Sequence, residues 1–376
     1  MWDPPRPSPR RPVTTNLSND ARRRHSLAYA ENRPDAPACQ ATLHIGRLSL
    51  YTVNHDSGAF AFLDRKLKAD LSLMFCSLIW GATFVVVKAG LEHSSPFLFL
   101  AVRFSIATVL MALYRPQVIR NAEREEIFAG LRLAFFMFAG YCFQTAGLQY
   151  TTATNSGFVT GSSVVLVPLL LGVFWGRTLT RWIYFGALAA LVGLYFLTVP
   201  LEGMRYLNRG DVMTLVAAGF YAIHIILVGE YSQGHSISAL SLIQVAGCAL
   251  MAWPLTAFSA AIHWQPVRFD WGWPLLSAIV ICAVFATAVA FTLQLWAQQY
   301  TSPGHAAILF ALEPVFAVIV SYLFLHERLT PRAWKGAALV VGGILLAELL
   351  GEPAAPEAPE PVFDGRIYFK PWWRRL

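Results

Sequence analysis

Two long apolar stretches near the end of the chain limit what this protein can fold into. The segment 303–350 contains both, joined by the short polar sequence His326, Glu327 and Arg328. A helix of roughly 20 residues rises about 1.5 Å per residue and crosses a hydrocarbon core of about 30 Å. Each stretch is long enough to do this, and the short connection makes the two antiparallel. The segment is predicted to be a transmembrane hairpin.

The composition extends this prediction to the whole chain. Of the 376 residues, 56% are hydrophobic and only 14% are charged, whereas a soluble domain is about a quarter charged. Apolar spans lie at about 70–91, 96–114, 128–149, 153–175, 180–199, 211–231, 238–259, 273–298, 303–325 and 331–350. The predicted fold is all-α, with ten transmembrane helices.

The second half of the chain repeats the first. At an offset of 150 residues and without a gap, Gln149, Tyr150, Thr151, Gly186 and Gly193 align with Gln299, Tyr300, Thr301, Gly336 and Gly343. At an offset of 141, Asp70, Trp80 and Arg103 align with Asp211, Tyr221 and Gln244. Five spans per repeat is an odd number, so the second half is expected to insert upside down relative to the first. Inverted repeats are typical of alternating-access carriers, whose substrate site lies near the bilayer midplane.

The repeats suggest a division of the chain into four parts. Residues 1–67 are rich in Arg, Pro and Ser and are predicted to be a disordered extension. The two repeats are expected at 68–200 and 210–351, followed by a cytoplasmic tail at 352–376. With a cytoplasmic N-terminus, the cytoplasmic segments hold about 20 Lys and Arg, against roughly six on the other side. Both termini are therefore expected in the cytoplasm, with the protein in the inner or plasma membrane.

Several functional classes are disfavoured. The basic residues lie mostly in tails and short loops, which is a topology pattern and not a nucleic-acid surface. The five cysteines lie far apart without a CxxC pair, which favours packing over metal or redox chemistry. The sequence contains no GxSxG, HExxH or phosphate-loop motif, so no enzyme, cofactor or metal is expected. The expected partners are a small solute and the bilayer, and a homodimer is compatible with the sequence.

Glu313 lies about ten residues into the ninth span, near the bilayer centre. A charge there is costly, so the side chain should face protein or water and find a partner or a proton. Low dielectric favours the protonated carboxyl, which would let Glu313 load and release a proton. Equally, a permanently protonated Glu313 would only pin its helix to a neighbour. Pro314 removes one backbone hydrogen bond and is expected to kink this helix, exposing a carbonyl to a cavity.

Two basic residues lie in the first two spans. Depth favours Arg103 over Lys88 as the partner of Glu313. Lys88 lies nearer the outer boundary, where it is expected to snorkel, although an inward Lys88 could meet a substrate carboxylate. Other side chains in the spans could line a polar cavity or make single interhelical hydrogen bonds. These are Trp80, Gln144, Ser162, Ser163, Tyr221, His224, Gln244 and Gln294.

Two motifs resemble those of the EamA-type drug/metabolite transporters. They are LIWGATFVVVK, with Trp80, Gly81 and Lys88, and ALEPVFAVIVSYLFLHERLT, with Glu313, Pro314, Glu327 and Arg328. The resemblance covers about residues 68–350. It implies export of small metabolites, amino acids or toxic compounds through a central cavity. The first half departs from the pattern, because Arg177 stands where Glu327 stands in the second.

The resulting functional prediction is a secondary carrier that exports amino-acid-like or drug-like metabolites, driven by a proton gradient or by exchange. A channel or passive pore is the main alternative. A nucleotide-sugar carrier would need more basic residues facing the cavity. A membrane-embedded transferase would need a catalytic cluster, which the sequence lacks.

Overall fold

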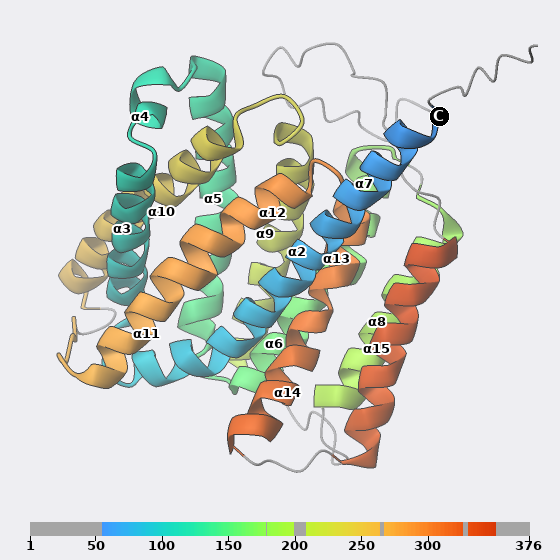
Figure 1. The fold of residues 1–376 in the computed structure, drawn as a ribbon. Helices are drawn as coiled ribbons and strands as arrows, with labels where there is room; N and C mark the ends of the chain where they lie inside the picture. Colours follow the sequence, from blue (N-terminus) through green and yellow to red (C-terminus); the bar gives the residue numbers. More distant parts are fainter. Residues whose placement is uncertain (1–54, 178, 199–207, 264–266, 326–329, 351–376) are drawn as a thin grey trace, which may run out of the picture. The chain divides into compact units, whose positions relative to one another are not determined.

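A computed structural model describes residues 55–177, 179–198, 208–263, 267–325 and 330–350. Within them the chain is almost entirely helical, and the helices lie alongside one another (Figure 1). One isolated antiparallel bridge joins Ser94 to Phe269. The predicted all-α class is therefore correct for the described residues.

Helices occupy all ten predicted spans. The first half contains α2 (His55–Leu91), α3 (Pro96–Tyr114), α4 (Gln117–Asn121), α5 (Arg124–Gly147), α6 (Ala153–Gly161), α7 (Ser163–Phe174) and α8 (Arg181–Thr198). The second half contains α9 (Arg209–Tyr231), α10 (Ile237–Ala261), α11 (Trp273–Ala283), a π-helical segment (Val284–Val289), α12 (Ala290–Ala297), α13 (Pro303–Phe310), α14 (Leu312–Leu325) and α15 (Pro331–Leu350). The short helix α4 lies in the connection between α3 and α5.

Among the described residues, seven helices are long and apolar enough to cross a membrane. They are Asp64–Leu91, Pro96–Tyr114, Arg124–Gly147, Asn155–Phe174, Arg209–Tyr231, Ile237–Ala261 and Trp273–Ala297. Arg181–Phe196 and Pro303–Ala317 are shorter apolar helices. The protein is therefore multi-pass, while the full number of ten crossings stays a prediction.

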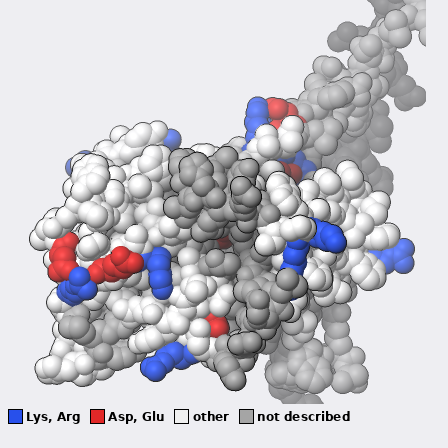
Figure 2. Space-filling model, turned by 90° about the horizontal axis from the view of Figure 1, so that it is seen from below, with Lys and Arg blue, Asp and Glu red and all other residues white. Residues whose placement is uncertain are grey.

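The outer surface of the helices is apolar. Leu113 is 73% exposed, Leu250 71% and Phe258 58%. Figure 2 views the molecule from below, toward the ends of the helices, and shows the described charged side chains there in a few separate groups. Large apolar side chains gain nothing from contact with water, so this surface fits a hydrocarbon environment.

Helix α2 begins earlier than the sequence suggested. The prediction of disorder for residues 1–67 is wrong for 55–67, which are helical, while residues 1–54 lie outside the described part of the chain. Acid–base pairs one turn apart stabilise a helix. Lys68 bonds Asp64 in this way, and the Lys66 ammonium lies 4.0 Å from the Asp70 carboxylate.

Spans four and nine are each broken into two helices. The breaks fall at Ser162 and Ala311, which differ by only one residue from equivalence at the offset of 150. Pro314 has no N–H to donate to the carbonyl oxygen of Phe310, which favours the second break. Val164 stands at the equivalent of Pro314 in the first half, so proline is not required for a break. The single helices predicted at 153–175 and 303–325 are thus corrected.

The fifth helices of the two halves, α8 and α15, pack side by side (Figure 1). A Cβ atom added at Gly186 would lie 2.6 Å from the carbonyl oxygen of Gly343, and one at Gly193 would lie 2.7 Å from that of Gly336. This register makes the helices antiparallel. The offset of 150 equates Gly186 with Gly336 and Gly193 with Gly343, so the contact is reciprocal.

A second reciprocal contact joins the ends of other helices. The Thr151 hydroxyl donates to Asp211 Oδ1 over 2.5 Å, and the Thr301 hydroxyl donates to Asp70 Oδ1 over 2.7 Å. Thr151 is equivalent to Thr301, and Asp70 to Asp211. Each half therefore uses the same threonine to bind the same aspartate of the other half.

Glycine at the α8–α15 contact is expected to be essential for stability. Gly186→Ala would place a methyl group against backbone and should lower the free energy of unfolding by about 1–3 kcal/mol, the usual cost of overpacking. Gly342→Ala is the matched control on α15, since nothing lies within 4 Å of its added Cβ. The control should be neutral or slightly stabilising, because alanine favours helix. Thermal unfolding in detergent measures both, and equal melting temperatures would contradict the close contact.

Candidate functional site

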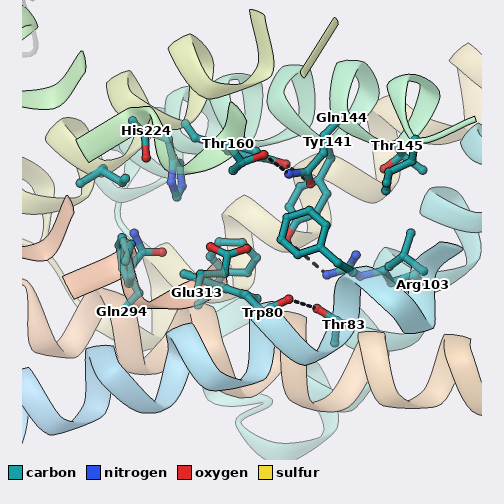
Figure 3. A pocket seen from close by; sticks show the side chains of 18 residues that line it. Trp80, Thr83, Arg103, Tyr141, Gln144, Thr145, Thr160, His224, Gln294 and Glu313 are labelled. Atoms are coloured by element: carbon teal, nitrogen blue, oxygen red, sulfur yellow. Dashed lines mark hydrogen bonds between the residues drawn. The ribbon is translucent and has the colours of Figure 1, made fainter. Parts of the chain in front are cut away.

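A cavity of about 90 Å³ lies among helices of both halves (Figure 3). Aromatic and aliphatic side chains make up half of its lining, and polar or charged side chains make up the other half. The lining residues are Trp80, Thr83, Phe84, Val87, Arg103, Tyr141, Gln144, Thr145, Leu148, Thr160, Ser163, Tyr221, His224, Ile225, Phe291, Gln294, Phe310 and Glu313.

Most of the lining residues occupy equivalent positions in the two halves. At the offset of 141 the pairs are Trp80 with Tyr221, Thr83 with His224, and Phe84 with Ile225. At the offset of 150 they are Tyr141 with Phe291, Gln144 with Gln294, Thr160 with Phe310, and Ser163 with Glu313. Both halves therefore build the same cavity with the same part of their sequence.

The charges break this equivalence. Arg103 belongs to the first half, and Gln244 stands at its equivalent position in the second. Glu313 belongs to the second half, and Ser163 stands at its equivalent in the first. The first half thus supplies the basic group of the cavity and the second half supplies the acidic one.

Arg103 is held on one side by neighbouring helices. Its Nε donates to Thr287 Oγ1 over 2.9 Å, and its Nη2 lies 3.3 Å from the Tyr141 hydroxyl and 3.5 Å from the Ala286 carbonyl oxygen. The guanidinium carbon lies 4.7 Å from the centre of the Tyr141 ring, within cation–π range. Nη1 makes no hydrogen bond to the described residues. Arg103 therefore keeps a donor free while its position is fixed.

The π-helical segment 284–289 provides the partners of Arg103. Thr287 Oγ1 donates to the carbonyl oxygen of Cys282, five residues earlier, over 2.8 Å. The Ala286 carbonyl oxygen also accepts from Trp80 Nε1 over 3.0 Å. Single π-helical turns inside α-helices often occur at functional sites. Here the turn presents a hydroxyl and a carbonyl to side chains of α2 and α3.

The predicted pair of Arg103 and Glu313 does not form. No described residue makes an ion pair or a hydrogen bond with the Glu313 side chain, which is half-buried and lines the cavity. Thr287 and Tyr141 bind Arg103 instead. Close packing positions the backbone of Glu313, because a Cβ atom at Gly81 of α2 would collide with its carbonyl oxygen. The helices therefore position Glu313 but give its carboxyl group no partner within the described segments.

The two equivalent glutamines have different partners. Gln144 Oε1 accepts from the Tyr221 hydroxyl over 3.0 Å, and its Nε2 donates to Thr160 over 2.9 Å. Gln294 Nε2 donates to Gln298 Oε1 over 3.0 Å, while Gln294 Oε1 is buried and has no partner among the described residues. The equivalents of Tyr221 and Thr160 are Trp80 and Phe310, neither of which has a hydroxyl to offer. Both polar atoms of the Gln144 amide therefore have partners, whereas the oxygen of the Gln294 amide has none among the described residues.

Four of the predicted site residues lie outside the lining. Lys88 donates to the carbonyl oxygens of Leu148 and Thr151 over 2.5 and 2.8 Å, so it caps the end of α5. Gln244 lies behind His224, 3.0 Å from its ring. Ser162 donates to the Val159 carbonyl oxygen, and Pro314 packs near Gly161.

Eight predicted residues line the cavity: Trp80, Arg103, Gln144, Ser163, Tyr221, His224, Gln294 and Glu313. Gly81 packs α2 against α14. Glu327 and Arg328 lie outside the described residues. Sequence reasoning missed Tyr141, Thr145, Thr160, Phe291 and Phe310. Alignment of the halves would have indicated two of these, since Tyr141 and Phe291 are equivalent aromatic residues.

This arrangement defines a helical, multi-pass membrane protein with a small central cavity. The model of the EamA-like transporter family matches residues 67–199 and again 208–349. The chain therefore belongs to the EamA-like transporter family and contains two copies of its domain. It is a membrane transporter of this family.

Relatives and a solved structure agree with this assignment. An uncharacterized transporter of Archaeoglobus fulgidus is 35% identical over 285 residues, covering 76% of this chain and 87% of the relative. A WAT1-related protein of Arabidopsis thaliana is 28% identical, covering 71% of this chain and 66% of the relative. A crystal structure with a TM-score of 0.62 is 19% identical and covers 75% of this chain and 96% of its own, which shows the shared fold.

Replacing Lys88 should destabilise the protein. In Lys88→Met the carbonyl oxygens of Leu148 and Thr151 lose their shared donor, at a cost of about 1–3 kcal/mol for each group left unsatisfied. The melting temperature in detergent should fall. Lys335→Met is the control, because Lys335 is exposed. Unchanged melting with lost substrate binding would instead place Lys88 in a substrate site.

Proposed function

We propose that this protein is a secondary carrier of small organic solutes that works by alternating access. The observation that carries the proposal is the cavity lined by equivalent positions of both halves. A cavity shared in this way changes its access when one half rocks against the other. The same observation favours a site that one solute occupies at a time over a continuous pore.

The reciprocal contacts support an inverted arrangement of the two repeats. The equivalent helices α8 and α15 run antiparallel at their glycine contact. The Thr151–Asp211 and Thr301–Asp70 bonds exchange the roles of the halves. Repeats of five helices each, at 68–200 and 210–351, with both termini in the cytoplasm, are consistent with these contacts. The excess of basic residues in the predicted cytoplasmic segments supports this orientation and a plasma-membrane location.

Glu313 is the proposed group for substrate or proton handling. It lines the cavity and has no ion-pair or hydrogen-bond partner among the described residues. Intramembrane carboxyl groups commonly mark substrate or ion pathways. Export driven by the proton gradient or by solute exchange would use this group.

Counterflow in proteoliposomes tests the carrier proposal. Vesicles loaded with a mixture of unlabelled amino acids and metabolites should accumulate external labelled solute transiently and saturably. A channel would conduct without saturation and without counterflow. Linear flux at all concentrations would therefore support the channel or passive pore in place of the carrier.

Glu313→Gln should reduce gradient-driven flux by about tenfold or more, because the amide keeps the shape but lacks the titratable proton. Glu125→Gln makes the same chemical change on an exposed residue of α5 and should leave flux unchanged. Equal amounts of both variants in the membrane are verified by blotting. Wild-type flux in Glu313→Gln would remove this residue from the mechanism.

A further inference from the structure

The cavity holds hydrogen-bond acceptors in one place and a free hydrogen-bond donor in another. Glu313 and Gln294 both reach the cavity from the second half, and Arg103 reaches it from the first. In the view of Figure 3, Glu313 and Gln294 lie toward one end and Arg103 toward the other. None of the three is paired with another of the three.

The orientation of the Gln294 amide follows from its neighbours. Gln298 Nε2 donates to the backbone carbonyl oxygen of Ile225 over 2.9 Å, and a carbonyl oxygen can only accept. Gln298 Oε1 must then be the acceptor toward Gln294, so Gln294 Nε2 is the donor of that bond. The remaining atom, Gln294 Oε1, is a buried acceptor that has no partner in the described part of the chain. Leaving such an atom unpaired is unfavourable, and a ligand donor would relieve the cost.

The surroundings of these acceptors suit a cationic donor. The Glu313 carboxyl and Gln294 Oε1 offer only acceptor atoms when the acid is ionised. The Trp80 ring lies edge-to-face with the Phe310 ring, with 5.2 Å between their centres. It is tilted relative to the Phe291 ring, with 5.3 Å between their centres. All three rings line the same cavity, and aromatic faces attract cations. An ammonium group would find acceptors and aromatic faces together.

At the other end of the cavity, Arg103 is suited to bind a negatively charged group. Arg103 is fixed by Thr287 and Tyr141, and its Nη1 has no partner among the described residues. A guanidinium with a free donor edge is well suited to a carboxylate. Its equivalent in the second half, Gln244, is turned to His224 and offers no charge. A carboxylate therefore has one preferred end of the cavity.

We propose that the cavity binds a zwitterionic substrate in one fixed orientation, with its ammonium group at Glu313 and Gln294 Oε1 and its carboxylate at Arg103. The inference rests on the proposed function, because it takes the cavity to be the substrate site. It assigns a substrate class and adds Gln294 as a specificity-determining residue.

The test compares each zwitterion with molecules that lack one of its charges. Purified full-length protein is titrated with leucine, 3-methylbutylamine and 4-methylpentanoate, and with phenylalanine, phenethylamine and 3-phenylpropionate. Ligand-dependent thermal unfolding gives the affinities. In at least one set the zwitterion should bind at least about tenfold more tightly than both analogues, because each missing charge leaves a buried group unpaired. Equal binding of an amine or a carboxylate, or no binding of either zwitterion, would overturn the proposal.

Variants separate the two ends. Gln294→Leu and Glu313→Gln should each weaken zwitterion binding about tenfold and leave the affinity of the carboxylate analogue unchanged. Arg103→Gln should weaken the zwitterion and the carboxylate and spare the amine. A purely structural role would weaken all three ligands together, which contradicts the proposal. Glu125→Gln serves as the control and should change none of the affinities.

Transport assays distinguish an error in the zwitterion site from an error in the carrier proposal. Saturable counterflow of a solute with one charge or none would retain the carrier and overturn the zwitterion site. Non-saturable conduction would overturn the carrier itself.

Discussion

Polar groups inside a hydrocarbon layer must find their partners within the protein, because no water is available there. Several irregular points of these helices are met by a side chain of another helix. Lys88 covers two carbonyl oxygens at the end of α5, Trp80 and Arg103 approach the carbonyl of Ala286, and Ser77 donates to that of Leu309. The breaks that shape the cavity are stabilised by these contacts.

Because the two halves of the chain are equivalent in sequence, differences between paired residues show where the site is asymmetric. Equivalent positions of both halves line the cavity, so a change at one of them alters one wall and not the other. The Gln144 amide forms hydrogen bonds with Tyr221 and Thr160, whereas Trp80 and Phe310 occupy the equivalent positions for Gln294. Trp80 stands in place of the tyrosine and donates its N–H to the Ala286 carbonyl oxygen, so the Gln294 amide oxygen has no donor among the described residues. The asymmetry of the site arises from these residues and from the π-helical segment 284–289, whose equivalent in the first half lies within the uninterrupted helix α5.

The apolar runs were enough to predict the helices, because burial in lipid demands long stretches without charge. Polar residues within these runs were enough to indicate much of the cavity, including Arg103, Glu313 and His224. Aromatic residues such as Phe291 could not be distinguished from lipid-facing ones, since composition does not show which face of a helix points inward.

The failure to predict the partners of Arg103 has a similar cause. Depth along the membrane normal is one coordinate, and in it Arg103 is nearer to Glu313 than Lys88 is. Rotation about the helix axis and the π-helical segment decide the partner, and neither can be read from spacing along a regular helix. Helix beyond His55 was missed because charged residues there suggested a disordered tail, although pairs one turn apart support helix.

The origin of the two charges in different halves limits what a simpler ancestor could recognise. A dimer of two identical five-helix chains, joined as these halves are, would carry either two arginines or two glutamates around its cavity. Such a protein would present the same groups to both ends of a ligand. Two unequal halves in one chain can place a basic group in one half of the cavity and an acidic group in the other.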